Sequence, residues 1–214
     1  MIDGEVVSEG DLSGPNGNRT VMQNPKVDVA VLEVARGGIV KRGLATSNVG
    51  GAVVMNVSED HLGVNGIDSV ADLALAKFTV QQAVRPGGHN VVNLDDELSH
   101  SFIDDLPRSK AFFSQHLAES ELLNHLKDPE DYACFVQDGA FYVYRHGEKQ
   151  HIAAIDDVDL TYKGLAKHNI ENVLAAICLS LELGRSYAEI TAGLLAFKND
   201  ENNQGRFNLF DVKG

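Results

Sequence analysis

Two apolar, β-branched runs with a short glycine-containing segment between them decide the fold. The first run is Val27-Asp28-Val29-Ala30-Val31-Leu32-Glu33-Val34, and the second is Ala52-Val53-Val54-Met55-Asn56-Val57. Nearly continuous apolar runs of this length predict strands that are covered by helices on both faces. Residues 35–45 between the runs are long enough for a short crossover helix. The order strand, helix, strand predicts a parallel sheet.

The rest of the chain predicts further elements of the same class. A helix is expected from Asp68 or Ser69 to about Val84, where Pro86-Gly87-Gly88 would stop it. The other expected elements are strands at 90–93 and 111–113, a hairpin at 135–144, and helices at 168–183 and 186–197. This order predicts an α/β fold, a three-layer α/β/α sandwich with a mainly parallel sheet and a small antiparallel insertion.

Composition narrows the class of protein. The 214 residues are 43% hydrophobic and 23% charged, which is typical of a packed globular chain. The net charge of -13 repels phosphate backbones and anionic lipid heads, so neither nucleic acid nor a membrane surface is an expected partner. Two cysteines, Cys134 and Cys178, cannot form a disulfide framework. With neither a signal peptide nor a membrane-spanning run in the sequence, we expect a cytoplasmic protein.

Ionisable residues follow both of the predicted strands. Glu33 ends the first, and the cluster Glu59-Asp60-His61 follows the second. Parallel strands would bring these groups to the same edge of the sheet, where ligands bind in such folds. Carboxylates with an imidazole would suit a divalent metal ion. Strand ends are also solvent-exposed and polar for that reason alone, and spacing does not choose between the two interpretations.

Lys77 lies on the apolar stripe of the predicted helix 68–84, together with Val70 and Leu73. A lysine in that position points inward. One interpretation is an ion pair with Glu33 or Asp60, or a stem that snorkels to water. The other is an amine that is kept neutral and becomes chemically modified, because partial burial lowers the pKa of an ammonium group.

The sequence contains no Walker-type phosphate loop. Gly38 and Gly43 have the required spacing, but Leu44-Ala45 follows where a lysine and a serine or threonine are needed. Nothing else in the chain matches that pattern.

Five motifs, in order along the chain, resemble the central domain of the Mur ligase superfamily. They are Leu32-Glu33-Val34-Ala35-Arg36-Gly37-Gly38-Ile39-Val40-Lys41-Arg42-Gly43-Leu44, Asn56-Val57-Ser58-Glu59-Asp60-His61-Leu62-Gly63, Asn93-Leu94-Asp95-Asp96, His168-Asn169-Ile170-Glu171-Asn172-Val173-Leu174-Ala175-Ala176 and Gly205-Arg206-Phe207-Asn208. The first motif is typical of the cyanophycin synthetase branch. The resemblance extends over nearly the whole chain.

This resemblance implies an ATP-dependent ligase that forms an amide through an acyl phosphate. Glu33 and His61 would bind Mg²⁺, and Lys77 would be carbamylated and act as a third, anionic ligand. These three would form the catalytic site, while the nucleotide would contact the set His168, Asn169, Asn172 and Arg206. In the cyanophycin branch, the substrates would be arginine and an aspartate polymer.

The resemblance also predicts the domain organisation. Residues 1–204 would be the central, ATP-binding domain without its phosphate loop, because the family places that loop upstream of Asp3, and residues 205–214 would begin the linker to a further domain. We therefore expect a fragment that is inactive alone and depends on a complementing chain or on oligomerisation. The alternatives are a non-catalytic remnant that only binds a ligand or partner, and a fragment of a peptidoglycan or folylpolyglutamate ligase.

Overall fold

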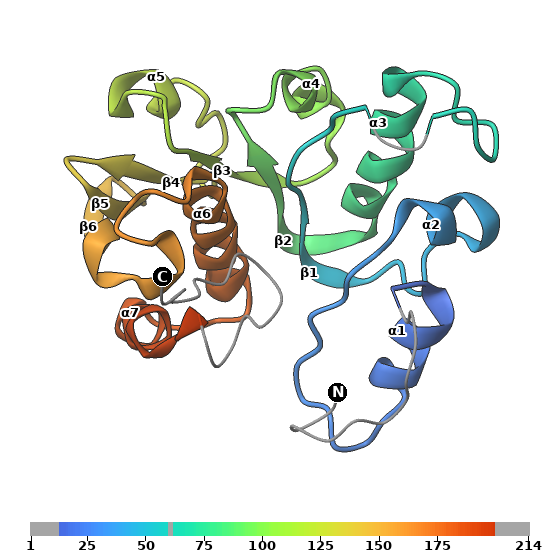
Figure 1. Ribbon diagram of the computed structural model, residues 1–214, viewed down its shortest axis with the longest axis horizontal. Helices are drawn as coiled ribbons and strands as arrows, with labels where there is room; N and C mark the ends of the chain where they lie inside the picture. The colour runs from blue at the N-terminus through green and yellow to red at the C-terminus, as the bar shows by residue number, and fades with distance from the viewer. Residues whose placement is uncertain (1–12, 60–61, 200–214) are drawn as a thin grey trace, which may run out of the picture. The chain divides into compact units, whose positions relative to one another are not determined.

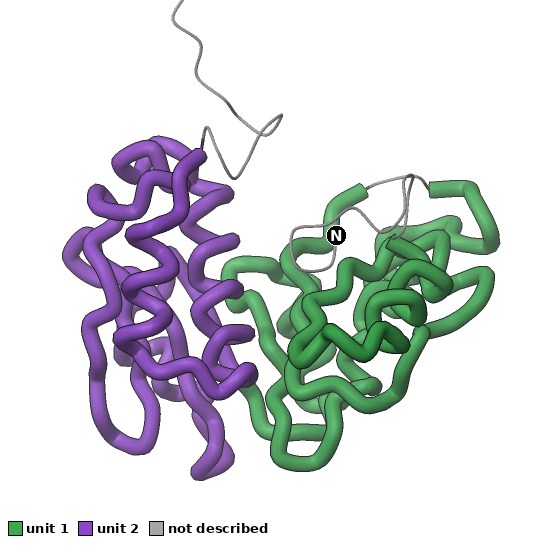
Figure 2. The backbone as a smooth tube through the Cα atoms, turned by 90° about the horizontal axis from the view of Figure 1, so that it is seen from below, with its two compact units in different colours: residues 1–110 green, residues 111–214 purple. Residues whose placement is uncertain are grey.

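The computed structural model describes residues 13–59 and 62–199 (Figure 1). The chain divides into two compact units, residues 1–110 and residues 111–214 (Figure 2). His61 and Arg206, two residues of the predicted sites, lie outside the described residues.

The first unit contains two parallel strands together with several short helices. Its elements are α1 (Pro15–Met22), α2 (Arg36–Arg42), β1 (Val49–Val54), α3 (Val70–Phe78), the 3-10 helix η1 (Thr79–Ala83), β2 (Val84–Asn93), α4 (Glu97–His100) and η2 (Ile103–Asp105). Strands β1 and β2 pair in parallel, with Val53 opposite Val91 and Val54 opposite Val92. Gly88 permits their close approach, because a Cβ atom there would lie 2.0 Å from the Gly50 carbonyl oxygen.

The helix predicted at 68–84 is shorter than expected. α3 begins with a capping box in which Ser69 and Asp72 bond reciprocally, and it ends at Phe78. The chain then tightens into η1, in which the buried side chain of Gln81 donates to the Val91 carbonyl oxygen at 2.9 Å. β2 therefore starts at Val84, ahead of Pro86 and the two glycines that were expected to stop the helix.

The prediction of a strand at residues 27–34 is wrong. This segment belongs to no strand, and Val29 and Val31 have exposed fractions of 48% and 79%. The expected crossover helix does form, as α2, and the second predicted strand forms as β1. A β-branched sequence needs a neighbouring strand to bond its peptide groups. Residues 27–34 have no such neighbour among the described residues.

The second unit is built around a buried strand. Its elements are β3 (Ser109–Ser114, which begins at the end of the first unit), α5 (Glu119–Leu123), β4 (Tyr132–Gln137), β5 (Ala140–Arg145), β6 (Glu148–Ala154), η3 (Ile155–Asp157), η4 (Asp159–Thr161), α6 (Lys167–Glu182) and α7 (Tyr187–Ala196). β4 pairs in parallel with β3 and antiparallel with β5, and β5 pairs antiparallel with β6. The antiparallel part is thus one strand larger than the predicted hairpin.

Both faces of β4 are buried, and two helices contact the strand. Residues 132–135 are all fully buried, although successive side chains of a strand point to opposite faces. On one face Tyr132 donates its hydroxyl hydrogen to the Cys178 carbonyl oxygen of α6 at 3.0 Å, and α5 also contacts the strand. Figure 1 shows α6 and α7 beside β4, β5 and β6. The predicted α/β fold with parallel and antiparallel strand pairs is confirmed.

No helix in the described part of the chain has the length and apolar character needed to cross a membrane.

Candidate functional site

The carboxyl ends of β1 and β2 are tied together by a network of polar side chains. Asn93, fully buried at the end of β2, donates to the Met55 carbonyl oxygen at 2.9 Å and to Asn56 Oδ1 at 3.3 Å. Its own Oδ1 accepts from the Asp95 backbone N–H at 2.9 Å. A buried amide that is bonded on both sides holds its neighbours in one position.

Asp96 adds a second tie across the same edge. Its Oδ1 accepts from the Val57 backbone N–H at 3.2 Å. Its Oδ2 caps α4 by accepting from the Ser99 backbone N–H at 3.0 Å and from the Ser99 hydroxyl at 2.6 Å. The network thereby fixes residues 55–57, which lead directly into Ser58-Glu59-Asp60-His61.

Lys77 reaches this edge from α3. Its Nζ donates to the Asn56 carbonyl oxygen at 3.0 Å, and the side chain is half-buried. Within residues 13–59 and 62–199 it forms no ion pair, so the predicted pairing with Glu33 does not form. The inward orientation predicted from the apolar stripe agrees with this contact.

Glu33 is exposed and lies three residues before α2. Its backbone carbonyl oxygen accepts from Asn18 Nδ2 of α1 at 3.3 Å, and α2 in turn contacts α3, the helix that carries Lys77. The described residues contain no cluster of three or more histidine, cysteine or carboxylate side chains that could hold a metal ion. The three-residue site Glu33, His61 and Lys77 therefore stays a prediction, of which the structure describes two members.

The second predicted set of residues lies at the start of α6. Asn169 is buried and already bonded within the protein, donating to the Leu160 carbonyl oxygen at 2.8 Å and accepting from Asn172 Nδ2 at 3.1 Å. His168 and Asn172 are exposed. Asn169 therefore orients this turn of the helix, while its two neighbours face outward.

The loop before α6 has an unusual backbone that composition did not reveal. Tyr162, Lys163 and Gly164 all have positive φ angles, of 49°, 54° and 79°. Thr161 holds the loop in place, since its Oγ1 donates toward the Ile155 and Val158 carbonyl oxygens and accepts from the Gly164 backbone N–H. Consecutive left-handed residues store strain and concentrate at ligand-binding sites.

The chain beyond α7 returns to this loop. Asn199 Nδ2 donates to the Asp159 carbonyl oxygen at 2.6 Å, and its backbone N–H donates to Asp159 Oδ2 at 2.8 Å. The last described residue before the segment that contains Arg206 is thus anchored at η4, next to the predicted nucleotide-binding turn. No sequence signal pointed to Asp159, because single aspartates are common in loops.

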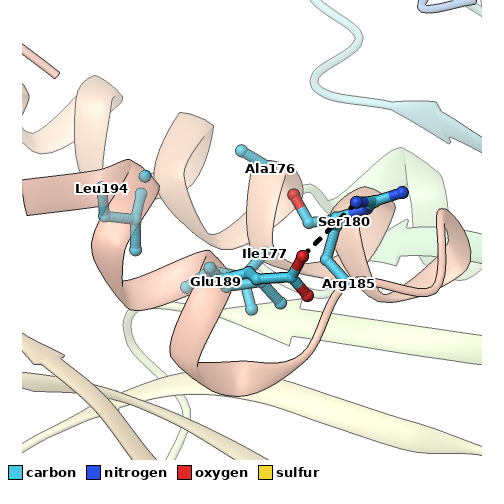
Figure 3. Close-up of a pocket in the computed structure, with 8 residues that line it drawn as sticks. Ala176, Ile177, Ser180, Arg185, Glu189 and Leu194 are labelled. Atoms are coloured by element: carbon cyan, nitrogen blue, oxygen red, sulfur yellow. Dashed lines mark hydrogen bonds and ion pairs between the residues drawn. The ribbon is translucent and has the colours of Figure 1, made fainter. Parts of the chain in front are cut away.

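A separate pocket lies between α6 and α7 (Figure 3). Ala176, Ile177, Ile190 and Leu194 give it an apolar lining, and an ion pair of 3.4 Å between Arg185 and Glu189 lies at its border. The pocket contains none of the predicted site residues, so it is not part of either candidate site.

Comparison with known proteins shows the family and the fold of the chain. The model of the Mur ligase middle domain family matches residues 11–180. The chain belongs to this family. It is 34% identical over 208 residues to a cyanophycin synthetase of Nostoc sp. (strain PCC 7120), an alignment that covers 97% of this chain and 23% of that protein. A cyanophycin synthetase of Synechocystis sp. (strain PCC 6803) is 32% identical, with 99% of this chain and 24% of that protein covered.

More distant matches belong to other Mur ligases. A UDP-N-acetylmuramoylalanine--D-glutamate ligase of Desulfitobacterium hafniense is 32% identical over 73% of this chain and 30% of that protein. A crystal structure of MurF from Acinetobacter baumannii superimposes with a TM-score of 0.64 at 18% identity, covering 95% of this chain and 42% of that one. The fold is therefore that of a Mur ligase middle domain. The chain spans about a quarter of the length of the cyanophycin synthetases that it matches.

Proposed function

We propose that this chain is the central, ATP-binding part of a cyanophycin synthetase-type ligase, which joins arginine to an aspartate polymer by an amide bond. The main support for the proposal is the share of this chain that aligns with cyanophycin synthetases. Cyanophycin synthetases align over 97–99% of the chain, whereas the D-glutamate ligase of D. hafniense aligns over 73%. The motif at residues 35–44, which is typical of the cyanophycin branch, supports the same choice.

The proposed metal site uses Glu33, His61 and Lys77 around Mg²⁺. The Glu33 carboxylate and a carbamylated Lys77 would supply the anionic oxygen ligands that Mg²⁺ prefers, and His61 would add an imidazole nitrogen. Mg²⁺ bound there would neutralise charge on the phosphoryl oxygens of ATP. The network of Asn93 and Asp96 holds residues 55–57, which precede His61 in the sequence, and the Asn56 carbonyl oxygen holds Lys77 at the same edge.

The proposed nucleotide site uses the exposed residues at the start of α6. His168 and Asn172 would contact the base, Asn169 would position them, and Arg206 would approach from the segment that follows Asn199. The left-handed loop 162–164 supports this assignment, because it shapes the surface immediately before these residues.

We further propose that the chain is inactive alone. It contains no phosphate loop, whose backbone N–H groups and lysine would bind the transferring phosphoryl group. ATP turnover would then require a complementing chain or the remainder of a longer polypeptide. Steady-state phosphate release by the purified chain with Mg²⁺, ATP, arginine and an aspartate oligomer should equal that of the Glu33→Ala variant. Release that Glu33→Ala abolishes would contradict this part of the proposal.

A chimera tests the substrate assignment. In the synthetase of Nostoc sp. (strain PCC 7120), the segment matched by this chain would be replaced by this chain, and amide formation would be measured with arginine and with glutamate as the amine. We expect turnover with arginine. Turnover only with glutamate on a folate or muropeptide acceptor would place the chain in another branch of the family.

Carbamylation of Lys77 has a readout that does not depend on activity. In ¹³C NMR after equilibration with ¹³C-bicarbonate, we expect a carbamate signal from the unmodified chain that Lys77→Arg removes. Lys163→Arg is the matched control, because Lys163 is exposed and should not retain CO₂. A carbamate signal that persists in Lys77→Arg would reject Lys77 as the modified residue.

A further inference from the structure

Two Asn-Gly pairs occur in the sequence, and they lie in different backbone environments. Asn16-Gly17 is part of helix α1, where Gly17 is buried and the Asn16 carbonyl oxygen accepts from the Thr20 hydroxyl at 3.0 Å. Asn65-Gly66 lies in the loop before α3, and both of its residues are exposed. The two pairs have the same local chemistry, so a difference in their reactivity would come from the fold.

Asn65 and Gly66 are the two central residues of a tight turn. Their φ angles are 59° and 78°, and Val64 and Ile67 on either side form an isolated antiparallel bridge. Two positive φ angles are typical of a type I′ turn, and asparagine followed by glycine favours that turn. The bond that closes the turn, from the Ile67 backbone N–H to the Val64 carbonyl oxygen, is long at 3.4 Å. The turn is therefore held less firmly than the backbone of a helix.

The groups that react when an asparagine loses its amide are accessible in this turn. Within residues 13–59 and 62–199, no group bonds the Asn65 side-chain amide or the Gly66 backbone N–H. A Cβ atom built at Gly66 would meet no atom within 4 Å, so the main chain is open to solvent there. Because glycine has no side chain next to its own nitrogen, the approach of that nitrogen to Asn65 Cγ is unhindered.

We propose that Asn65 is a site of spontaneous deamidation, which converts it to isoaspartate and aspartate in the folded protein. The Gly66 backbone nitrogen attacks Asn65 Cγ, loses its proton and displaces the side-chain nitrogen as ammonia, which closes a succinimide ring. One water molecule then opens the ring. Cleavage of the ring bond to Cγ gives aspartate, and cleavage of the bond to the main-chain carbonyl carbon gives isoaspartate. The proposal does not rest on the proposed ligase function, because water is the only co-reactant.

Isoaspartate should disrupt the turn, whereas aspartate should not. Aspartate, like asparagine, tolerates a positive φ angle. Isoaspartate instead adds a methylene group to the main chain of a two-residue turn, whose ends are joined by the 2.7 Å bond from the Gly63 backbone N–H to the Ile67 carbonyl oxygen. Ile67 is buried, and Ser69 caps α3 two residues later. Isoaspartate at position 65 should therefore loosen the packing of Ile67 and the first turn of α3.

Ageing of the purified chain tests the site. The folded chain and the chain unfolded in urea are incubated in parallel at mildly alkaline pH, and mass-spectrometric peptide mapping follows both Asn-Gly pairs. In the folded chain we expect Asn65 to react at least about tenfold faster than Asn16, because α1 must open before Asn16 can react. In urea the two rates should converge. A folded chain in which Asn65 stays intact, or in which Asn16 reacts as fast as Asn65, overturns the proposal.

Asn65→Asp is the matched control for the structural consequence, because it introduces the charge of the product without the extra methylene group. Anion exchange separates the deamidated fraction of the aged chain, and an isoaspartyl methyltransferase assay measures its isoaspartate content. Amide hydrogen exchange at residues 63–72 should be faster in this fraction than in the unmodified chain, while Asn65→Asp should leave it nearly unchanged. If the isoaspartate-containing fraction exchanges no faster than Asn65→Asp, isoaspartate leaves the turn intact and the proposed consequence is wrong.

Discussion

Residues 27–34 and strand β4 have equally strand-like sequences but different environments. Both contain β-branched or aromatic residues that favour strands, yet β4 is fully buried from Tyr132 to Phe135, whereas Val31 has an exposed fraction of 79%. β4 has a bonded strand on each side and helices that contact it, while residues 27–34 have no strand neighbour in the described part of the chain. Composition therefore shows that a segment can form a strand, and the partner for its backbone decides whether it does.

The largest expected difference is in the loss of stability when one side chain of each segment is truncated to alanine. Phe135→Ala should lower the free energy of unfolding by about 3–5 kcal/mol, because it leaves a cavity in a fully packed core. It also removes the ring that stacks on Tyr142 and that Lys149 covers. Val31→Ala should change stability by less than about 0.5 kcal/mol in the monomer. Urea denaturation at low protein concentration measures both, and similar losses would show that residues 27–34 are packed in solution.

The second prediction concerns the strand pair that does form in the first unit. Gly88→Ala should cost about 1–3 kcal/mol, because its Cβ would lie 2.0 Å from the Gly50 carbonyl oxygen and would push β1 from β2. Gly37→Ala in α2 is the matched control. It meets no atom within 4 Å and should be neutral or stabilising, since alanine favours a helix. Equal stability of both variants would mean that the β1–β2 contact at Gly88 relaxes without cost.

Much of the fold could be predicted because its signals are local. Ser69 and Ser186 cap α3 and α7 where the sequence placed helix starts, and the apolar runs before Asn56 and around Phe135 form strands as expected. Whether residues 27–34 join a sheet depends on a neighbour that is distant in sequence. No periodicity within the segment carries that information.

Of the candidate site, the sequence predicted the orientation of one side chain but not the hydrogen bonds around it. The apolar stripe of α3 indicated that Lys77 points inward, and the structure places its amine at the end of β1. The ties made by Asn93 and Asp96 were not predicted, although Asn93-Leu94-Asp95-Asp96 was part of the resemblance, because they link residues that are nearly forty positions apart. The left-handed backbone at Tyr162 and Lys163 was not predicted, because neither residue is a glycine, the residue type that usually indicates a positive φ angle.

A third, smaller effect is the loss of folding stability at high pH that the buried ionisable groups of Tyr132 and Cys178 should cause. Burial raises the pKa of Tyr132 well above its usual 10.0, with further contributions from Cys178, Cys134 and Glu182. Burial likewise raises the pKa of the Cys178 thiol above 9.0. Raised pKa values favour the protonated, folded form. The stability that they contribute is therefore complete below the unfolded pKa values and decreases as the pH rises above them.

Tyr132→Phe isolates one of these two groups. It removes the hydroxyl that donates to Glu182 Oε1 at 2.9 Å and to the Cys178 carbonyl oxygen, which should cost about 0.5–1.5 kcal/mol at pH 7. Above pH 10 the variant should lose stability less steeply than the unmodified chain, because one titrating group is gone. Urea denaturation between pH 7 and pH 11 measures both effects, and parallel pH profiles would mean that Tyr132 does not resist ionisation in the folded state.

The smallest expected effect compares the helix starts of the two units, which should behave alike. Hydrogen bonds from Ser69 lower the pKa of Asp72 at the start of α3, and those from Ser186 lower the pKa of Glu189 at the start of α7. A lowered pKa contributes stability above the unfolded values of 3.8 and 4.5, and this contribution is lost as the pH falls through the lowered folded value. Ser69→Ala and Ser186→Ala should each lower stability slightly at pH 7 and by less at pH 3, where the carboxyl groups become protonated. Both capping boxes lie within the first turn of one helix, so neither loss of stability should depend on the environment of residues 27–34. If Ser69→Ala destabilises the chain far more than Ser186→Ala does, α3 depends on its cap because the packing around it in the first unit is weaker than the packing around α7.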